Sequence, residues 1–272
     1  MPTSYLITGV SRGIGFAFLQ NLSENPDNIV IGLVRDKATT DKKIAAEIGS
    51  RSNIHIFQAD LLNYDEIKST VEPVSTITGG SIDYIIANAA LVQHYAVNFP
   101  IGIAAQDPDK FEESLLETFR VNVIGQAKLF NAYMPLLLKG QTKKAIAITS
   151  ALGDLESIRK VNIKISVAYS ISKAALNALV AKYHTQYAEQ GVLFLAISPG
   201  LVETGGYANM TPEEIPHVQE MMASFSNFAP DARPAAPHES VRDVLNVIYK
   251  SSLENGDGGQ FVSHLGSTTQ WL

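Results

Sequence analysis

Tyr169 and Lys173 are the residues in this sequence whose types and spacing most plainly allow acid–base chemistry. They lie in the stretch AYSISKAALNAL, where apolar residues recur at helical spacing. Residues at i and i+4 share one face of a helix with Cβ atoms about 5–6 Å apart, so the Lys173 ammonium can act electrostatically on the Tyr169 phenol. A nearby positive charge favours the phenolate and lowers a pKa that is ordinarily about 10. An ordinary pair of solvated helix residues is the alternative interpretation.

A glycine-rich turn, TGVSRGIG, follows the first apolar run of the chain. Its glycines are Gly9, Gly13 and Gly15, directly after Thr8. Glycines allow a tight turn and a close approach of backbone N–H groups to a pyrophosphate, and the helix that follows presents its positive end. The position after a strand and before a helix indicates a dinucleotide site, although a simple turn would have the same composition.

The elements that must position these residues alternate along the chain. Short β-branched runs are separated by longer amphipathic stretches, clearest at 109–138 and 168–190. The predicted strands lie at 4–9, 28–35, 53–60, 82–90, 144–151, 192–200 and 259–264. This alternation predicts an α/β protein with a single Rossmann-type, doubly wound parallel sheet of about seven strands and helices on both faces.

Composition excludes several classes of function. The 272 residues are 46% hydrophobic and 18% charged, which is typical of a folded globular protein. A net charge of −6 without a basic cluster argues against nucleic-acid binding. The lack of cysteine, and of any HxxxH or HxH spacing among the histidines, predicts no catalytic metal. No apolar run reaches the roughly 18–20 residues of a membrane span and the first residues do not resemble a signal peptide, so we expect a cytoplasmic protein.

Read together, the motifs resemble those of the short-chain dehydrogenase/reductase family, over nearly the whole chain. In order, these are the turn at Thr8–Gly15, Asp60 after the third strand, NAA at 88–90, Asn122 in the long fourth helix, Ser150 ending the fifth strand, the Tyr169–Lys173 pair and PGLVET at 199–204. Within the family the chain looks most like sniffer-type carbonyl reductases and fungal norsolorinic-acid ketoreductases. Two features depart from the family pattern. Ala90 stands where glycine is usual, and the interval from Ser150 to Tyr169 is unusually long.

The resemblance implies a carbonyl reductase that transfers hydride between NADPH and a ketone or aldehyde, or the corresponding secondary alcohol. It implies that Tyr169 is the acid/base, that Lys173 modulates it and binds the nicotinamide ribose, and that Asn122 holds a water linking Lys173 to solvent. A solvent-facing Asn122 is the alternative. Ser150 would bind the substrate oxygen; neighbouring Thr149 is a second candidate, but only one of two adjacent strand residues can face the pocket. The implied cofactor-binding residues are Thr8, Gly9, Ser11, Arg12, Gly13, Ile14, Gly15, Arg35, Asp60, Leu61, Asn88, Ala89, Ala90, Tyr169, Lys173, Pro199, Gly200, Val202 and Thr204.

Charge at the end of the second strand favours NADP(H) over NAD. Val34 and Arg35 stand where NAD-preferring members carry a carboxylate, and Arg12 precedes Gly13. Two cations suit a 2′-phosphate. Solvated arginines are one alternative, and Asp36, one residue further on, is a possible ribose ligand that would favour NAD.

We expect one family domain over 1–272, with a dinucleotide-binding half at about 1–90 and a catalytic half at about 91–202 and 241–272. The segment 203–240 is rich in Pro, Met and Phe, fits neither a strand nor a long helix, and is interpreted as an irregular substrate lid over an apolar or aromatic carbonyl compound. Ordinary packing beneath a loop is the alternative.

Two further expectations concern activity and assembly. The same residues would serve an alcohol dehydrogenase that works in the oxidative direction, and a non-catalytic NADP-sensing protein is a third hypothesis. Family members form dimers or tetramers through their long helices, here 109–138 and 168–190. The apolar stretch Ala174–Ala181 favours a homodimer, and a monomer in which the 152–168 loop covers that surface is the alternative.

Overall fold

The centre of the computed structural model, which describes residues 2–203, 205 and 210–271, is a seven-stranded sheet in the order β3-β2-β1-β4-β5-β6-β7. All neighbouring strands pair in parallel. The strands are β1 (Thr3–Thr8), β2 (Asn28–Val34), β3 (Ile54–Gln58), β4 (Tyr84–Ala87), β5 (Lys144–Ile148), β6 (Leu193–Ser198) and β7 (Phe261–Ser263). The strand order reverses between β1 and β4, and sheets of this kind bind ligands at the carboxyl ends of the strands beside such a switch point.

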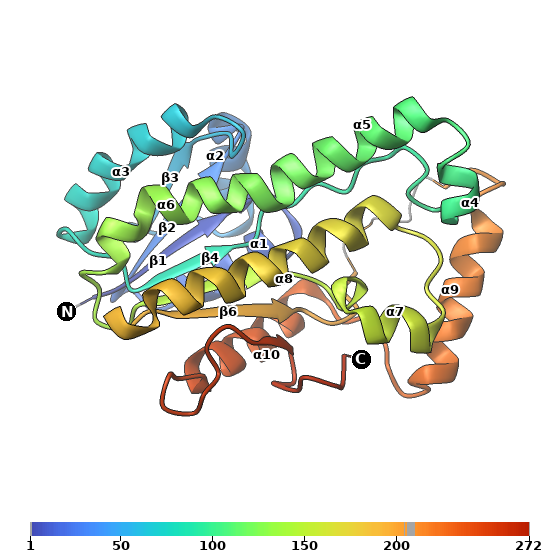
Figure 1. Cartoon of the computed structure of the whole chain (residues 1–272). Helices are drawn as coiled ribbons and strands as arrows, with labels where there is room; N and C mark the ends of the chain where they lie inside the picture. Colours follow the sequence, from blue (N-terminus) through green and yellow to red (C-terminus); the bar gives the residue numbers. More distant parts are fainter. Residues whose placement is uncertain (1, 204, 206–209, 272) are drawn as a thin grey trace.

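Helices cover both faces of the sheet (Figure 1). They are α1 (Gly13–Leu22), α2 (Lys37–Glu47), α3 (Tyr64–Thr78), α4 (Ile101–Ala104), α5 (Pro108–Phe119), α6 (Gln126–Leu137), α7 (Leu155–Val161), α8 (Val167–Tyr187), α9 (Ile215–Phe228) and α10 (Pro237–Lys250). Helices α3, α6 and α8 lie together over one face, and α1 and α10 pack together on the other. The predicted doubly wound parallel sheet is confirmed.

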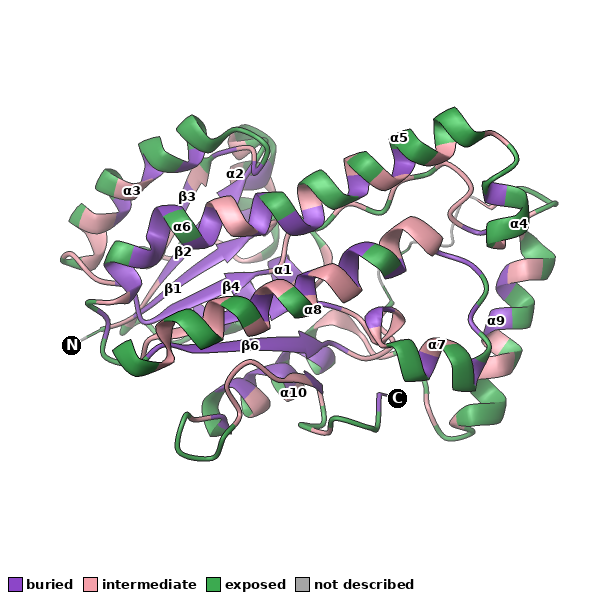
Figure 2. Cartoon of the chain, viewed as in Figure 1, coloured by how far each residue is buried: buried purple, intermediate pink, exposed green. Residues whose placement is uncertain are grey.

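Two apolar cores, one on each face, hold these layers together. On the first face Phe130 and Tyr133 of α6 and Leu176 of α8 pack on the strands. On the second, Leu19 of α1 and Val244 of α10 do the same. The strands are buried along most of their length, whereas the outer faces of the helices are exposed (Figure 2). Strands covered on both faces must be apolar at successive positions, which is why they were recognisable as continuous apolar runs.

The predicted long helix at 109–138 contains an irregularity. It consists of α5, a π-helical segment at Arg120–Gly125 and α6, in direct succession. The π-helical segment includes Asn122, and such single-turn π segments occur frequently at functional sites. Nothing in the local sequence distinguishes it from ordinary α-helix.

The prediction that 203–240 contains no long helix was wrong. Helix α9 occupies Ile215–Phe228. Val218, Met221, Met222 and Phe225 recur at the spacing of one helix face and are buried or half-buried. Pro216 does not interrupt the helix, because it lies in the first turn of α9, where proline is tolerated.

The long interval between Ser150 and Tyr169 also contains a helix, α7, which packs against α9. Val161 and Ile163 join Val218 and Met221 in a third, smaller apolar cluster. An ion pair between Lys164 and Glu220 links the same two segments on the surface. The 152–168 segment therefore contacts α9 to form an apolar cover beside Ser150, instead of being only a loop.

No helix in the described part of the chain is long and apolar enough to span a membrane.

Candidate active site

The glycine turn after β1 is packed too closely for side chains. A Cβ at Gly15 would lie 2.2 Å from the carbonyl oxygen of Gly9, and one at Gly9 would lie 2.9 Å from the Cα of Ala89. Gly9 and Gly13 also have φ values of +73° and +58°, in the region that favours glycine. These glycines hold the end of β1 against the loop after β4 and start α1 at Gly13.

The N-terminus of α1 leaves its first backbone N–H groups without a side-chain cap. Arg12, at the N-cap position, makes no capping bond, and the first turn carries no acidic residue. By contrast, Asp36, Asn63 and Asp107 accept backbone N–H groups at the starts of α2, α3 and α5. An uncapped helix start behind a tight glycine turn fits the phosphates of a dinucleotide. Ser11 and Arg12 are exposed there, and Ile14 is half-buried.

Thr8 and Asn88 join the ends of β1 and β4. The Thr8 hydroxyl accepts the backbone N–H groups of Asn88 and Ala89 at 3.1 and 3.0 Å. The Asn88 amide donates to the carbonyl oxygen of Thr8 at 2.9 Å. These two predicted cofactor residues therefore fix the wall of the crevice, and Ala90, the next residue but one, is exposed at its edge.

The ends of β3 and β2 carry the remaining predicted residues of the dinucleotide half. Asp60 accepts the Leu62 N–H at 2.9 Å, and Leu61 is buried against Gly125 of the π-helical segment. Arg35 is exposed after β2. In the described part of the chain, neither Arg35 nor Arg12 takes part in an ion pair.

Asp36 uses its carboxylate to start α2. One oxygen accepts the backbone N–H of Thr39 at 2.9 Å and the other accepts the Thr39 hydroxyl at 2.6 Å. The Thr39 hydroxyl and backbone bonds hold the pKa of this carboxyl below its usual value. Each carboxylate oxygen accepts one of these bonds, and the exposed carboxylate keeps further lone pairs that can accept a ribose hydroxyl.

Tyr169 and Lys173 lie in the first turns of α8, as predicted, with the Lys173 Nζ 5.4 Å from the centre of the Tyr169 ring. Lys173 is only 2% exposed and donates a hydrogen bond of 2.8 Å to the carbonyl oxygen of Ile148, the last residue of β5. Burial lowers the pKa of Lys173 to about 7. The ammonium is thus held between the strand that leads to Ser150 and the tyrosine ring.

The structure distinguishes between the two candidate hydroxyls after β5. Ser150 borders a cavity of about 100 Å³, and its Oγ accepts the Leu152 N–H at 3.2 Å. Thr149 is buried, is not part of that cavity's lining, and its hydroxyl has no partner among the described residues. Ser150 is therefore the hydroxyl that can meet a ligand.

Asn122 faces the interior, so the solvent-facing alternative is wrong. Its Oδ1 accepts the Leu91 N–H at 2.7 Å, and its Nδ2 donates to the Leu91 carbonyl oxygen at 2.9 Å and to the Ser172 hydroxyl at 3.0 Å. Ser172 in turn donates to the carbonyl oxygen of Tyr169 at 2.7 Å. Leu91 and Ser172 were not predicted from the sequence; the helical offset of Ser172 from Tyr169 was the available signal.

The PGLVET segment lies after β6. Pro199 accepts the Ser240 hydroxyl of α10 at 2.7 Å, and Val202 forms a strand-like bridge with Ala235. Gly200 has a φ of +81°, and a Cβ there would lie 2.7 Å from the His264 ring. The predicted residue Thr204 lies outside the described residues.

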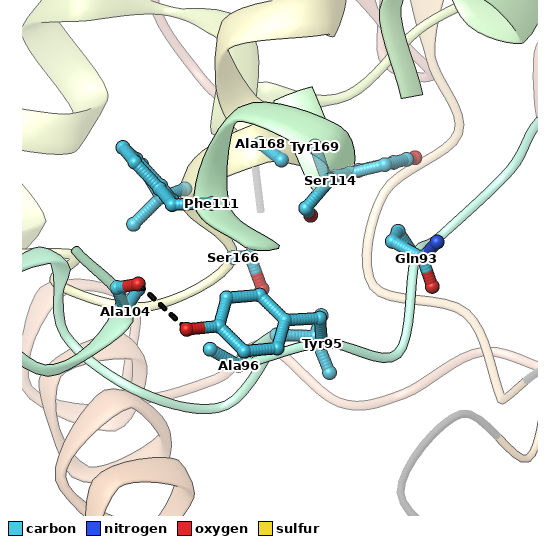
Figure 3. A pocket seen from close by; sticks show the side chains of 11 residues that line it. Gln93, Tyr95, Ala96, Ala104, Phe111, Ser114, Ser166, Ala168 and Tyr169 are labelled. Atoms are coloured by element: carbon cyan, nitrogen blue, oxygen red, sulfur yellow. Dashed lines mark hydrogen bonds between the residues drawn. The ribbon is translucent and has the colours of Figure 1, made fainter. Parts of the chain in front are cut away.

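Two hollows flank these residues, and they differ in size. The larger, about 100 Å³, is bordered by Ser150 and by apolar side chains from α7 and α9. The smaller, about 10 Å³, lies between Tyr95, Ser114 of α5 and the start of α8 at Tyr169 (Figure 3). That volume holds about one water molecule. The larger hollow is therefore the candidate substrate cavity.

The described residues contain no group of three or more His, Cys, Asp or Glu side chains placed to hold a metal ion. The arrangement instead combines a dinucleotide crevice with a phenol, an ammonium and a hydroxyl at the carboxyl edge of the sheet. It defines the class of nicotinamide-dependent Rossmann-fold oxidoreductases.

Comparison with known proteins agrees with this class. A family model described as short chain dehydrogenase matches residues 4–215. Curated relatives include Short chain dehydrogenase virK of Hypocrea virens, 48% identical with 100% of each chain covered. Another is Short-chain dehydrogenase/reductase iacC of Pestalotiopsis fici, 43% identical with 98% of this chain and 99% of the relative covered. The chain belongs to the short-chain dehydrogenase/reductase family and is an oxidoreductase of that type.

Solved structures share the fold. An NADPH-bound carbonyl reductase from chicken fatty liver superposes with a TM-score of 0.78 at 23% identity, with 100% of both chains covered. Carbonyl reductase Sniffer of D. melanogaster does so with a TM-score of 0.76 at 23% identity, with 98% of both chains covered.

Proposed function

We propose that the chain is an NADPH-dependent carbonyl reductase acting on an apolar or aromatic ketone or aldehyde. The observation that carries this proposal is the placement of Lys173 between Tyr169 and the strand end that leads to Ser150. The bound nicotinamide supplies or accepts the hydride, and the protein must deliver or remove a proton at the same oxygen. A phenol, an ammonium and a hydroxyl at the carboxyl edge of the sheet provide the groups for that proton transfer.

Each predicted catalytic residue has a separate task in the proposal. Ser150 donates a hydrogen bond to the substrate oxygen and stabilises the charge that develops on it. Tyr169 gives its phenolic proton to that oxygen in reduction and removes it in oxidation. Lys173, when charged, favours the phenolate and binds the ribose of the cofactor. Asn122 positions the catalytic helix through Ser172 and Leu91.

The remaining predicted residues would hold the dinucleotide. The turn at Thr8–Gly15 and the free N-terminus of α1 would receive the pyrophosphate. Asp60 and Leu61 would border the adenine, Asn88 to Ala90 the adenosine ribose, and Pro199 to Val202 the nicotinamide.

The preference for NADP(H) is supported by two side chains at the adenosine end. The exposed Arg12 and Arg35 have no partner carboxylate among the described residues, so a 2′-phosphate can pair with both. Asp36, the residue that would favour NAD, caps α2 and keeps lone pairs for a ribose, so the comparison of NADPH with NADH decides between the two cofactors.

A panel of ketones and aldehydes, scored by NADPH consumption and repeated with NADH, tests the proposal. We expect turnover with apolar and aromatic carbonyl compounds and a clear preference for NADPH. Oxidation of secondary alcohols with NADP⁺ measures the reverse reaction, since the same residues serve both directions. Binding of NADPH without turnover of any carbonyl or alcohol would instead support the NADP-sensing alternative.

We also propose a symmetric homodimer through α5 and α8, with a cytoplasmic location as predicted from the sequence. The apolar surface that supports the dimer is not the one expected from the sequence. Within Ala174–Ala181, all of which the structure describes, Ala178 alone is exposed, while Leu176 is buried. The exposed large apolar residues on this side are instead Leu116 and Phe119 of α5 and Ile171 of α8.

A further inference from the structure

The C-terminal tail closes one side of the substrate cavity with the chain's one tryptophan. Trp271 lines the cavity that Ser150 borders, although 121 positions separate the two residues in sequence. Figure 1 shows the chain ending close to α7. No sequence motif pointed to this residue, since the contact depends entirely on how the tail folds back after β7.

The tail is held in place by a compact set of hydrogen bonds. The Ser263 N–H donates to the Ser267 carbonyl oxygen at 2.8 Å, and the Gly266 N–H donates to the Ser263 carbonyl oxygen at 2.9 Å. The Ser267 hydroxyl then accepts the N–H groups of Thr269 and Gln270 at 3.1 and 3.0 Å. These bonds turn the chain immediately after the sheet, so that Trp271 returns toward the cavity.

The indole of Trp271 is fixed by stacking. Its ring lies 4.2 Å from that of Phe261 in β7, with an angle of 21° between the planes, and the residue is 4% exposed. Phe261 thus covers part of the indole, while the rest borders the cavity. A large ring held against a strand presents a rigid wall and loses little conformational entropy when a ligand arrives.

The rest of the lining fits an uncharged aromatic ligand. Phe225, Phe228 and Met221 of α9 face the same cavity, and the lining, among the described residues, contains no charged side chain. Its polar side chains are the serines at 150, 157 and 198, and the Ser198 hydroxyl already accepts the Ala151 N–H. Aromatic rings and a methionine thioether favour contact with another aromatic ring.

The size of the cavity limits what it encloses. Its volume of about 100 Å³ is smaller than the roughly 150 Å³ of an apolar cavity known to hold benzene. One ring of a substrate therefore fills the enclosed part after modest adjustment, and the remainder of a larger molecule extends toward the mouth.

We propose that Trp271 is a specificity-determining residue that selects flat aromatic ketones by contact with the substrate ring, while Ser150 on the same cavity meets the carbonyl oxygen. This inference rests on the proposed reductase activity and names its substrate class. It also gives the C-terminal tail a role in the site.

The test compares 1-tetralone, a fused-ring aromatic ketone, with cyclohexanone, which has a ring of similar reach but no aromatic face. Trp271→Ala should lower kcat/KM for 1-tetralone about tenfold, mainly through KM, and leave cyclohexanone within about twofold. Trp271→Phe, which keeps an aromatic ring, should keep most of the wild-type kcat/KM for 1-tetralone. Leu265→Ala is the matched control, because Leu265 lies in the same tail, is 56% exposed and does not line the cavity.

Binding supplies a second measurement that needs no turnover. Because Trp271 is the sole tryptophan of the chain, 1-tetralone should change the tryptophan emission of the cofactor-free protein saturably, and cyclohexanone should not do so at the same concentration. If Trp271→Ala proves unstable, Trp271→Phe and Trp271→Leu carry the test: the preference for 1-tetralone should survive in the first and vanish in the second.

The outcomes separate the two proposals. Equal effects of Trp271→Ala on both ketones, or no effect on either, overturn the role of Trp271 while leaving the reductase activity standing. Saturable binding of 1-tetralone without NADPH consumption by any carbonyl compound upholds the aromatic site and overturns the reductase proposal.

Discussion

Lys173 on α8 and Ile148 at the end of β5 are joined by a hydrogen bond of 2.8 Å from the buried ammonium to the backbone carbonyl oxygen. The bond fixes the catalytic helix relative to the strand that leads to Ser150. It also places a cation where burial lowers its pKa to about 7, so the cofactor-free protein carries a partly charged lysine at neutral pH. The charge that acts on Tyr169 is therefore sensitive to pH and to what binds beside it.

The first prediction concerns stability against pH. The pKa of Lys173 is lowered on folding, so between about pH 7 and the unfolded pKa of about 10.4 the unfolded chain binds more protons than the folded one. The free energy of unfolding should therefore rise with pH in this window, by about 2–3 kcal/mol from about pH 7.5 to about pH 9.5. Denaturant unfolding of the cofactor-free protein measures it.

Lys173→Met is the control for this effect, because it keeps the length of the side chain and removes the charge. Its stability should change much less over the same pH range. The range stops below pH 10 because burial raises the pKa of Tyr183 to about 12, and a tyrosine kept protonated by folding makes stability fall again as the pH rises past 10. Parallel pH curves for wild type and Lys173→Met would contradict the assignment.

The second prediction is that Tyr169→Phe abolishes proton transfer without disturbing cofactor binding. The ring is kept and only the hydroxyl is lost, so kcat should fall by at least about 10²–10⁴-fold. The Kd for NADPH, measured by fluorescence, should stay nearly unchanged. Tyr95→Phe is a matched control near the same helix start, because the Tyr95 hydroxyl donates to the Ala104 carbonyl oxygen and has no part in the proposed chemistry. Near-normal turnover by Tyr169→Phe would exclude the mechanism.

The third prediction concerns Ser172, which links Asn122 to the backbone of Tyr169. Ser172→Ala leaves the Tyr169 carbonyl oxygen without this donor and removes one partner of Asn122. Loss of one such bond corresponds to about 1 kcal/mol, so we expect kcat to fall roughly fivefold with little change in KM.

Ser170→Ala tests whether the effect of Ser172→Ala is specific. Ser170 is also buried on α8, but its hydroxyl has no partner among the described residues. Its removal should leave kcat unchanged and stability equal or slightly higher. If both substitutions lower kcat alike, α8 is sensitive to any change there, and Ser172 has no special positioning role.

The fourth prediction concerns cofactor choice. Replacing Arg12 and Arg35 together by alanine should weaken NADPH binding by about 100-fold or more, since charge-assisted hydrogen bonds contribute roughly 1.5–3 kcal/mol each. NADH binding should change little. Arg242→Ala, which removes an exposed arginine on α10, is the control. Equal losses for both cofactors, or a preference of the wild type for NADH, would show that these arginines do not hold a 2′-phosphate.

Local sequence patterns predicted the sheet and its two covering layers because each strand and helix carries its own periodicity. Motif order located Tyr169, Lys173 and Ser150 for the same reason: these residues end strands or begin helices that the pattern identifies. The features that escaped prediction are contacts between distant segments. Asn122, which lies in the π-helical segment, hydrogen-bonds the backbone N–H and carbonyl oxygen of Leu91 through its side chain. Trp271, in the C-terminal tail, lines the cavity that Ser150 borders. Helix α9 is different, because the helical spacing of Val218, Met221, Met222 and Phe225 was present in the sequence.

The last prediction is assembly. Leu116, Phe119 and Ile171 are 46, 38 and 48% exposed on α5 and α8, two helices that pack side by side. Apolar side chains of this size on adjacent helices favour a buried contact, and a twofold axis would bring the same patch of a second copy against them. The 152–168 segment covers part of α8, since Gly153 lies against Lys173 and Ala174, but it leaves Leu116, Phe119 and Ile171 exposed. Light scattering should therefore give close to twice the chain mass of 29.4 kDa at micromolar concentration, and Ile171→Glu should return it to 29.4 kDa.

Leu253→Glu, at an exposed apolar residue beyond the end of α10, should remain dimeric. A wild-type mass of 29.4 kDa across the micromolar range would establish the monomer instead.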